Sequence, residues 1–338
     1  MNSQVFFDDI ALFKSTFPLA GALENSCILV TGATGLIGRC IVEFLLASVE
    51  RIKIIAPVRN VRKAREMFSA RKELDIIESD LVDFLAADDL IFDYAIHCAS
   101  PTNGSFIASH PAETFTMMYD TTRNLLEAAR RCHARGVVYI SSIEYYGVIE
   151  QERYPINETE QGVINHDSLR SAYPLGKQAC EFLCKSYSAE YGLRVMIARP
   201  TQIFGAGTAE TENRVFAQFA KSIVDSSDIV LHTKGNSSKP YCYTTDAVSA
   251  LLYILLLGQA GEAYNIANED TYMSVRQLAE YLVKSFCPGI SIKIDLHPEL
   301  AYAPDTFVPL STSKLQELGW RPLVGLHEMF RRYISYIK

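Results

Sequence analysis

Short apolar runs and longer segments with helical hydrophobic spacing alternate along the first two hundred residues. The runs are rich in β-branched residues and have the length of buried strands. They begin at Cys27 and continue at 52–58, 74–79, 94–100, 137–142 and 194–198. Amphipathic stretches lie between most of them, notably 61–72 and 110–132. This alternation predicts an α/β fold with a mainly parallel, doubly wound sheet, whose ligands bind beyond the carboxyl ends of the strands.

A glycine-rich turn directly follows the first predicted strand and opens an apolar helix. A turn that lacks Cβ atoms lets the backbone approach a pyrophosphate, and the helix N-terminus offers free N–H groups and a partial positive charge. The turn is therefore predicted to bind a dinucleotide. The predicted cofactor contacts in this turn are Gly32, Thr34, Gly35, Leu36, Ile37 and Gly38.

The residue at the end of the second predicted strand indicates whether the dinucleotide is NAD or NADP. An acidic residue there would bind the ribose 2′-OH of NAD, but this chain has Arg59, followed by Arg62 and Lys63. Arginine suits a 2′-phosphate, so the position favours NADP over NAD. A solvated, basic start of a helix is the alternative interpretation.

The segment SAYPLGK places Tyr173 four residues before Lys177. Residues i and i+4 are neighbours on a helix face, and Pro174 is tolerated in a first helical turn. The pair is either a proton-transfer device or two side chains that share a face, and the spacing alone leaves both open.

Composition excludes several classes of protein. Hydrophobic residues make up 49% and charged residues 21% of the chain, as in an ordinary globular protein. The net charge of −7 gives no basic footprint for nucleic acid, so an anionic ligand would need a local basic site.

The longest apolar run, from Ala250, is too short for a bilayer and predicts a core helix. With no signal-peptide profile at the N-terminus, we expect a soluble cytoplasmic protein.

Neither cysteines nor histidines form a metal pattern. There is no CxxC motif, and reduced, buried cysteines are expected. The histidines are scattered, so we assign no metal.

Three motifs in order, the glycine turn, ISSIEYYG (140–147) and the Tyr173–Lys177 pair, together resemble the extended short-chain dehydrogenase/reductase family, specifically its nucleotide-sugar epimerases, dehydratases and decarboxylases. The likeness covers nearly the whole chain. Further similar segments are SDL (79–81), HCASP (97–101), NLLEAAR (124–130), RPTQIFGAG (199–207), YNIAN (264–268) and LGWRP (318–322).

The resemblance implies a Rossmann-type NAD(P)-binding domain and a smaller C-terminal substrate-binding lobe. Residues 1–200 would form the first, with segments near 241–270 returning to it, and 201–338 would mainly form the second. The additional cofactor contacts that it implies are Asp80, Leu81, Ala99, Ser100, Pro101, Tyr173, Lys177 and Pro200.

The resemblance also assigns the catalytic roles. Tyr173 takes the proton of the sugar 4-OH while hydride passes to the nicotinamide, Lys177 binds the nicotinamide ribose, and Ser142 holds the same hydroxyl. A Tyr base near neutral pH needs its pKa lowered by roughly 3 units from about 10. A nearby ammonium and the nicotinamide charge can supply much of that shift.

The fate of the 4-ketone depends on further residues. Glu144 resembles the acid/base of dehydratases and of UDP-glucuronate decarboxylases, whereas Ile143 replaces the Asp that dehydratases place before it. Arg170 resembles a decarboxylase arginine and could lie near a substrate carboxylate or a phosphate. A helix-capping or surface role stays open for Glu144, and a purely structural role for Arg170.

The substrate lobe departs from the family at one position. The family has an arginine seven residues before Asp246, gripping the nucleotide diphosphate, and this chain has Lys239. Lysine holds phosphate as a point charge without the bidentate fork. The segment 210–223 is expected to form a wall of the lobe. The implied substrate contacts are Thr102, Arg170, Thr201, Asn213, Arg214, Lys239 and Tyr241.

The leading hypothesis is an enzyme that oxidises a nucleotide-diphosphate sugar at C4 with bound NAD or NADP. It then decarboxylates, dehydrates or epimerises the 4-keto intermediate, in a pathway such as polysaccharide biosynthesis. The alternatives are an NADPH-dependent reductase of a 4-keto sugar or other carbonyl, and a non-enzymatic dinucleotide sensor on the same fold. The resemblance further implies a homodimer through the helices expected at 110–132 and 174–191.

Overall fold

A seven-stranded parallel sheet forms the larger part of the molecule. The computed structural model describes residues 3–68, 70–150, 154–296 and 305–338. The strand order is β10-β6-β5-β4-β1-β2-β3, and every neighbouring pair is parallel. The strands are β1 (Cys27–Thr31), β2 (Lys53–Val58), β3 (Leu74–Glu78), β4 (Tyr94–His97), β5 (Gly136–Ile140), β6 (Val195–Pro200) and β10 (Ala263–Ile266). The predicted doubly wound sheet is confirmed, and its order reverses between β1 and β4.

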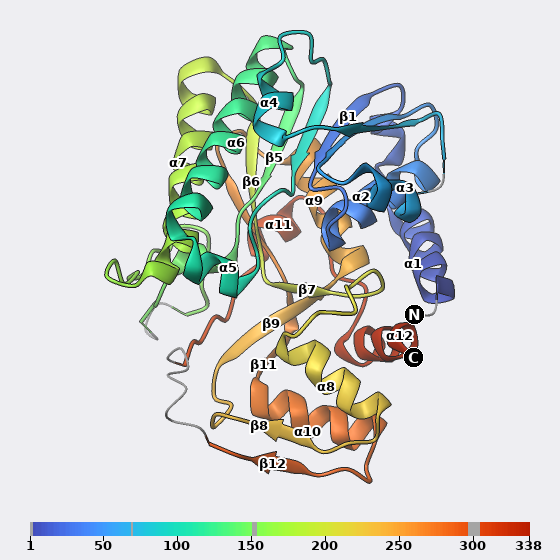
Figure 1. Ribbon diagram of the computed structural model, residues 1–338, viewed down its shortest axis with the longest axis vertical. Helices are drawn as coiled ribbons and strands as arrows, with labels where there is room; N and C mark the ends of the chain where they lie inside the picture. Colours follow the sequence, from blue (N-terminus) through green and yellow to red (C-terminus); the bar gives the residue numbers. More distant parts are fainter. Residues whose placement is uncertain (1–2, 69, 151–153, 297–304) are drawn as a thin grey trace.

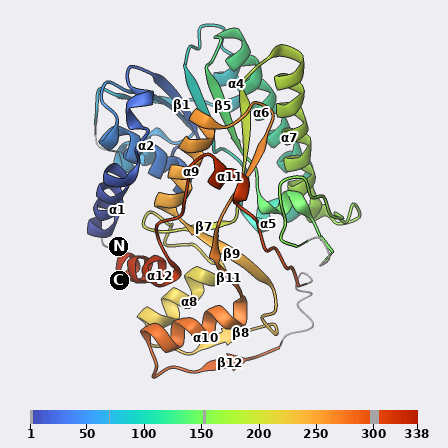
Figure 2. The ribbon, with the colours of Figure 1, turned by 180° about the vertical axis from the view of Figure 1, so that it is seen from behind.

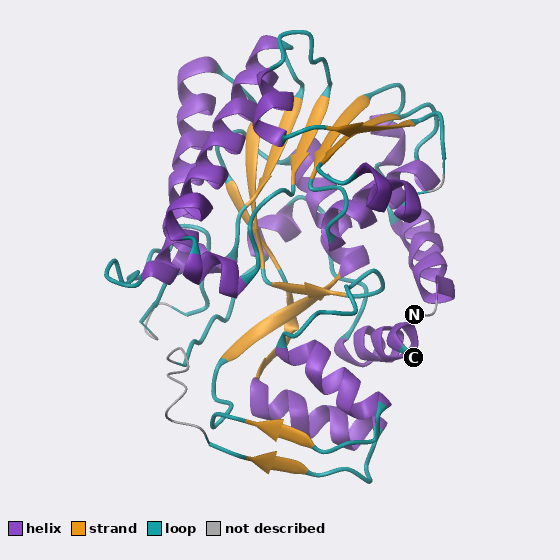
Figure 3. Cartoon of the chain, viewed as in Figure 1, coloured by secondary structure: helices purple, strands orange, loops and turns teal. Residues whose placement is uncertain are grey.

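Helices cover both faces of this sheet because successive strand residues point to opposite sides. In β1, Ile28 and Val30 pack towards one hydrophobic cluster and Leu29 towards another. The first cluster includes α1, α2 and α9, and the second includes α6 and α7 (Figures 1 and 3). The helices around the sheet are α1 (Ser3–Thr16), α2 (Leu36–Ser48), α3 (Val61–Met67), α4 (Leu81–Ala86), α5 (Gly104–Ser109), α6 (Pro111–Arg131), α7 (Ala172–Tyr191), α9 (Thr244–Leu257) and α11 (Ser313–Glu317).

The expected core helix from Ala250 lies within α9, which packs on β5 and β6 and faces the viewer in Figure 2. The helix expected at 61–72 is shorter than predicted, because α3 ends at Met67 and Phe68 is its extended C-cap. Within the described parts of the chain, no helix is both long and apolar enough to cross a membrane.

The smaller lobe lies beyond the carboxyl edge of the large sheet, below it in Figure 1. It contains a three-stranded sheet in the order β11-β9-β7 and a two-stranded sheet of β12 and β8. Its elements are β7 (Gln202–Phe204), α8 (Val215–Val224), β8 (Ile229–Leu231), β9 (Ser238–Tyr243), β11 (Asn268–Ser274), α10 (Val275–Phe286), β12 (Ile292–Ile294) and α12 (Leu326–Ile337). The segment expected at 210–223 forms a helix only from Val215, so Asn213 and Arg214 precede it.

The N-terminal helix α1 was not predicted from the sequence. It packs Phe13 against Phe44 of α2, with 5.0 Å between ring centroids. Its fully buried Asp9 accepts a hydrogen bond from the Tyr243 hydroxyl at 2.8 Å and pairs with Arg332 of α12 at 2.7 Å. These contacts fasten both ends of the chain to the junction between the sheet and the smaller lobe.

Candidate active site

The glycine turn has the geometry that a pyrophosphate requires. Gly32 has a φ of +66°, and a Cβ there would lie 2.8 Å from the Ala99 nitrogen. A Cβ on Gly38 would lie 2.3 Å from the Gly32 oxygen. Gly35 is the N-cap of α2 and supplies no side-chain cap, so the first N–H groups of the helix receive no capping side chain. The turn therefore fits a phosphate-bearing cofactor.

Other predicted cofactor residues lie at the same edge of the sheet, because each follows the end of a parallel strand. Arg59 is exposed after β2, and Asp80 caps α4 after β3 through one carboxylate oxygen, 2.8 Å from the Val82 nitrogen. Ser100 follows β4, and its buried hydroxyl oxygen has no hydrogen-bond partner. An orphaned hydroxyl beside the glycine turn fits a polar ligand group. Also at this edge are Thr34, Leu36, Ile37, Leu81, Ala99, Pro101 and Pro200.

Tyr173 and Lys177 are both buried in the first two turns of α7, and Pro174 lies in its first turn as predicted. The Lys177 ammonium donates a hydrogen bond to the Ile140 carbonyl at the end of β5, at 2.7 Å. It lies 5.6 Å from the centroid of the Tyr173 ring. Burial lowers the pKa of Lys177 to about 8.

Burial and the neighbouring charges together shift the pKa of Tyr173 upward. Burial, together with the charge of Glu144, raises it to about 12, whereas the hydrogen bond with Ser142 and the charges of Arg214 and Arg170 lower it. Lys177 is not among the largest influences on this pKa, and its ammonium donates a hydrogen bond to the Ile140 carbonyl. The chain alone therefore holds the phenol protonated, and a bound cationic nicotinamide would have to supply the downward shift.

Glu144 and Arg170 meet one another on the substrate side. Glu144 lies in a 3-10 turn, η2 (Ile143–Tyr146), whose N-cap Ser142 accepts a hydrogen bond from the Glu144 nitrogen at 3.2 Å. Arg170, in η4 (Leu169–Ser171), donates to both Glu144 carboxylate oxygens at 2.9 and 3.2 Å. Arg170 was expected to lie near a substrate carboxylate or phosphate, and its partner in the structure is the Glu144 carboxylate.

Lys239 and Arg214 are two further cationic side chains close to Glu144 and Arg170. Burial lowers the pKa of Lys239, and the charges of Glu144, Arg214 and Arg170 act on it as well. Arg214 forms an ion pair with Glu212 at 2.5 Å. The charges that act on Lys239 therefore place Lys239, Arg214, Arg170 and Glu144 in one cluster.

The remaining predicted substrate residues differ in accessibility. Thr102 is exposed just before α5, and Asn213 is exposed just before α8. Thr201 donates a hydrogen bond to the Pro240 carbonyl at 2.6 Å, and Tyr241 is buried with its ring 6.0 Å from that of Phe204. Asp246, seven residues after Lys239, accepts hydrogen bonds from the Leu323 and Val324 nitrogens.

Sequence reasoning missed the buried group that holds η2. Arg199 at the end of β6 pairs with Glu181 of α7 at 2.6 Å and donates to the Tyr146 hydroxyl at 3.0 Å. Its guanidinium carbon lies 3.5 Å from the centroid of the Tyr145 ring. An arginine inside the apolar run RVMIARP was the available signal, since a buried charge needs a partner.

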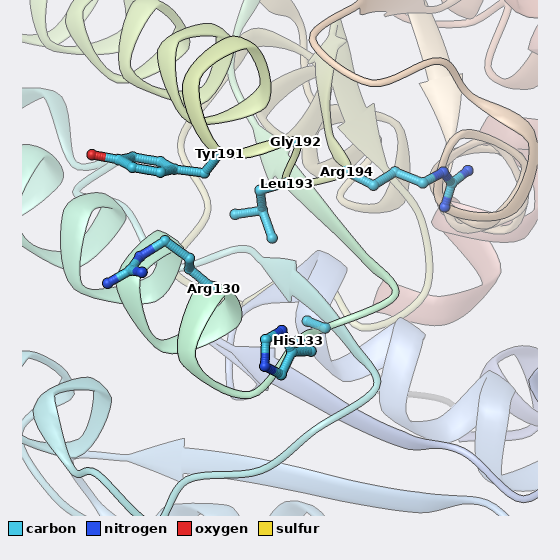
Figure 4. Close-up of a pocket in the computed structure, with 7 residues that line it drawn as sticks. Arg130, His133, Tyr191, Gly192, Leu193 and Arg194 are labelled. Atoms are coloured by element: carbon cyan, nitrogen blue, oxygen red, sulfur yellow. The ribbon is translucent and has the colours of Figure 1, made fainter.

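A surface hollow lies at the opposite edge of the sheet, between the C-terminal ends of α6 and α7. Arg130, His133, Tyr191, Leu193 and Arg194 are among the residues that line it (Figure 4). The Arg130 guanidinium and the Tyr191 hydroxyl point away from its centre (Figure 4). Because ligands of doubly wound sheets bind at the carboxyl edge, this hollow is not the candidate site. The described residues contain no cluster of His, Cys, Asp and Glu suited to a metal ion.

Comparisons with known proteins agree with this geometry. The NAD dependent epimerase/dehydratase family matches residues 28–267. UDP-glucuronic acid decarboxylase 1 of Danio rerio is 27% identical over 93% of this chain and 73% of its own length. UDP-glucuronic acid decarboxylase 6 of Arabidopsis thaliana is 27% identical over 90% of this chain and 87% of its own.

Solved structures share the fold. UDP-glucose 4-epimerase of Thermotoga maritima, with UDP-glucose, superimposes with a TM-score of 0.79 at 21% identity, covering 92% of this chain and 98% of that one. The dTDP-glucose 4,6-dehydratase DesIV of Streptomyces venezuelae, with NAD, gives 0.76 at 23% identity, covering 92% and 96%. The family match spans well over half of the sequence, and the chain therefore belongs to the NAD dependent epimerase/dehydratase family.

Proposed function

We propose that this chain oxidises the C4 hydroxyl of a nucleotide-linked sugar with a bound nicotinamide dinucleotide and then decarboxylates the 4-ketone. The observation that carries the proposal is the grouping of Ser142, Tyr173 and Lys177 at the carboxyl edge of the sheet, where the Lys177 charge acts on Cys98 and a Cβ on Gly32 would meet the Cys98 backbone. The similarity to UDP-glucuronic acid decarboxylases supports decarboxylation over epimerisation.

The proposed roles follow from what each side chain can reach. Tyr173, as the phenolate that would form with the cationic cofactor bound, accepts the proton of the C4 hydroxyl, and its neighbour Ser142 orients that hydroxyl. The Lys177 ammonium holds the nicotinamide ribose and stabilises the phenolate. The glycine turn, Asp80 and Ser100 hold the rest of the dinucleotide. When bound, the cofactor accepts hydride from C4 and later returns it, so the net reaction needs no external oxidant.

The ketone determines the next step. A C5 carboxylate beside a C4 ketone is a β-keto acid. The bond between the carboxylate carbon and C5 breaks, CO₂ leaves, and the electron pair of that bond moves towards the C4 oxygen to give an enolate. C5 then takes up a proton. Glu144, the carboxylate in this cluster, is proposed to take up a proton from water and to pass it to C5. Elimination of water would need a second acid, and the preceding residue is Ile143.

The test is product analysis with a panel of nucleotide sugars. Wild-type protein is expected to convert a nucleotide uronate to a product lighter by one CO₂. Tyr173→Phe should abolish turnover with dinucleotide binding intact, whereas the control Tyr191→Phe, on the same helix, should retain activity. Glu144→Gln should permit C4 oxidation but stall decarboxylation. Full activity of Tyr173→Phe would refute the proposed base.

A second candidate function is an NADPH-dependent reductase of a 4-keto sugar or other carbonyl. Arg59 supports it, because this exposed cation stands at the end of β2, where a 2′-phosphate would lie. A reductase would release its oxidised cofactor after each turnover. Cofactor that stays bound through many cycles of dialysis and turnover would favour the decarboxylase.

We also propose a homodimer through α6 and α7, which lie side by side on one face of the sheet (Figure 1). Phe115 and Tyr119 of α6 are partly exposed, and Phe182 of α7 is 73% exposed. Phe182→Glu should give a monomer by light scattering. A wild-type protein that is already monomeric would exclude this interface.

A further inference from the structure

Arg170 already holds a carboxylate in this structure. Its two terminal nitrogens lie 2.9 and 3.2 Å from the two oxygens of Glu144. This bidentate arrangement matches the planar geometry of a carboxylate group in general, with no requirement that it belong to the protein. The Arg170 guanidinium therefore has the geometry to receive a carboxylate, and Glu144 occupies that position in the structure.

The pair lies where a uronate carboxylate would arrive. Glu144 raises and Arg170 lowers the pKa of Tyr173, so both charges act on the phenol that is proposed to meet the C4 hydroxyl. In a uronate, the carboxylate is attached to C5, the ring carbon next to C4. A sugar whose C4 hydroxyl meets Tyr173 would thus bring its carboxylate close to this ion pair.

The pair is also easy to exchange. The side chains of Arg170 and Glu144 are 55% and 36% exposed, and ion pairs at such exposure contribute little free energy. Arg214 is less available, because its partner Glu212 is more buried and also accepts backbone hydrogen bonds from Asn213 and Arg214. Of the two arginines in the cluster, Arg170 can therefore exchange its carboxylate partner at the lower cost in free energy.

We propose that Arg170 selects the carboxylate of a nucleotide-linked uronate and that Glu144 is its internal competitor. The substrate carboxylate takes the guanidinium and releases Glu144, which then takes up a proton from water and serves as the acid at C5. A neutral sugar has no carboxylate to exchange, so Glu144 stays paired with Arg170. This inference rests on the proposed function, and it makes substrate charge the condition for freeing Glu144.

The test compares matched ligands and variants. UDP-glucuronate, UDP-glucose and UDP are titrated by calorimetry into the dinucleotide-loaded enzyme, in a Tyr173→Phe background that prevents turnover. Arg170→Gln should weaken UDP-glucuronate about tenfold or more and leave UDP-glucose within about twofold. Glu144→Gln should strengthen UDP-glucuronate by up to about fivefold, the equivalent of about 1 kcal/mol, because it removes the competitor. Arg276→Gln, from an equally exposed ion pair on α10, is the control and should change neither affinity.

Kinetics separate recognition from a structural role. With the Tyr173 base restored, Arg170→Gln should raise KM for the uronate without an equal fall in kcat, since Glu144 is then already free. Equal weakening of all three ligands by Arg170→Gln would indicate a phosphate contact and overturn the inference. The inference would also be overturned if the Glu144→Gln variant bound UDP-glucuronate no more tightly than the parent protein. If wild-type protein binds and converts no nucleotide sugar, the proposed function itself fails, which is a distinct result.

Discussion

The Arg199–Glu181 ion pair is the most consequential buried contact beside the candidate site. The two side chains are 0% and 1% exposed. Arg199 donates three hydrogen bonds to Glu181, at 2.6, 3.0 and 3.2 Å, and two more to the Tyr146 hydroxyl and the Glu158 carbonyl. Glu181→Gln keeps the shape of the side chain and removes its charge. The guanidinium would then be buried without a counter-charge.

The expected cost is large because a buried charge that loses its partner keeps its full desolvation penalty. Breaking such pairs destabilises proteins by about 3–5 kcal/mol. In a chain of this size, that corresponds to a fall in Tm of roughly 4–7 °C. Glu280→Gln is the matched control, because its partner Arg276 is exposed and the loss should stay below about 1 kcal/mol.

The assay is urea-induced unfolding of both variants, followed by circular dichroism. Glu181→Gln should also lower kcat, because Arg199 contacts Tyr145 and Tyr146 in the turn that carries Glu144. An unfolding free energy within about 1 kcal/mol of wild type would refute the reasoning. So would equal effects of the two variants.

Three further predictions follow from single groups. Gly38→Ala should weaken dinucleotide binding by more than tenfold in a fluorescence titration, since its Cβ would clash with the Gly32 oxygen, whereas Gly21→Ala, with open space, should not. Burial raises the pKa of Asp246 from 3.8 to about 6, so the folded state favours the protonated form. About 3 kcal/mol of stability should be lost as pH rises from about 4 through 6, and Asp246→Asn should flatten that part of the pH profile; an unaltered profile would contradict the assignment. Arg59→Ala should weaken NADP about tenfold or more and spare NAD, whereas equal effects on both would exclude a 2′-phosphate contact.

Local patterns in the sequence were sufficient to predict the sheet and the residues at its carboxyl edge. Apolar runs fixed the strands, and the parallel order then brought the glycine turn, Ser100 and Tyr173 to one edge. The i, i+4 spacing placed Tyr173 and Lys177 on α7 as expected.

Long-range contacts could not be predicted in this way. Nothing near Glu144 indicates that its partner is Arg170, 26 residues later. The Lys177 hydrogen bond to Ile140 depends on the packing of α7 against β5, and the burial that raises the pKa of Tyr173 likewise depends on tertiary packing. Helix α1 was missed because its stability depends on Phe13 and Asp9 finding partners far along the chain.

Isotope transfer at C4 tests the central claim most directly. The Glu144→Gln variant is loaded with oxidised dinucleotide, mixed with UDP-glucuronate that carries deuterium at C4, and quenched before the cofactor is analysed by mass spectrometry. The account predicts deuterium on the nicotinamide ring, and none when Tyr173→Phe is added. Release of CO₂ from the wild-type protein with no deuterium ever reaching the cofactor would contradict it.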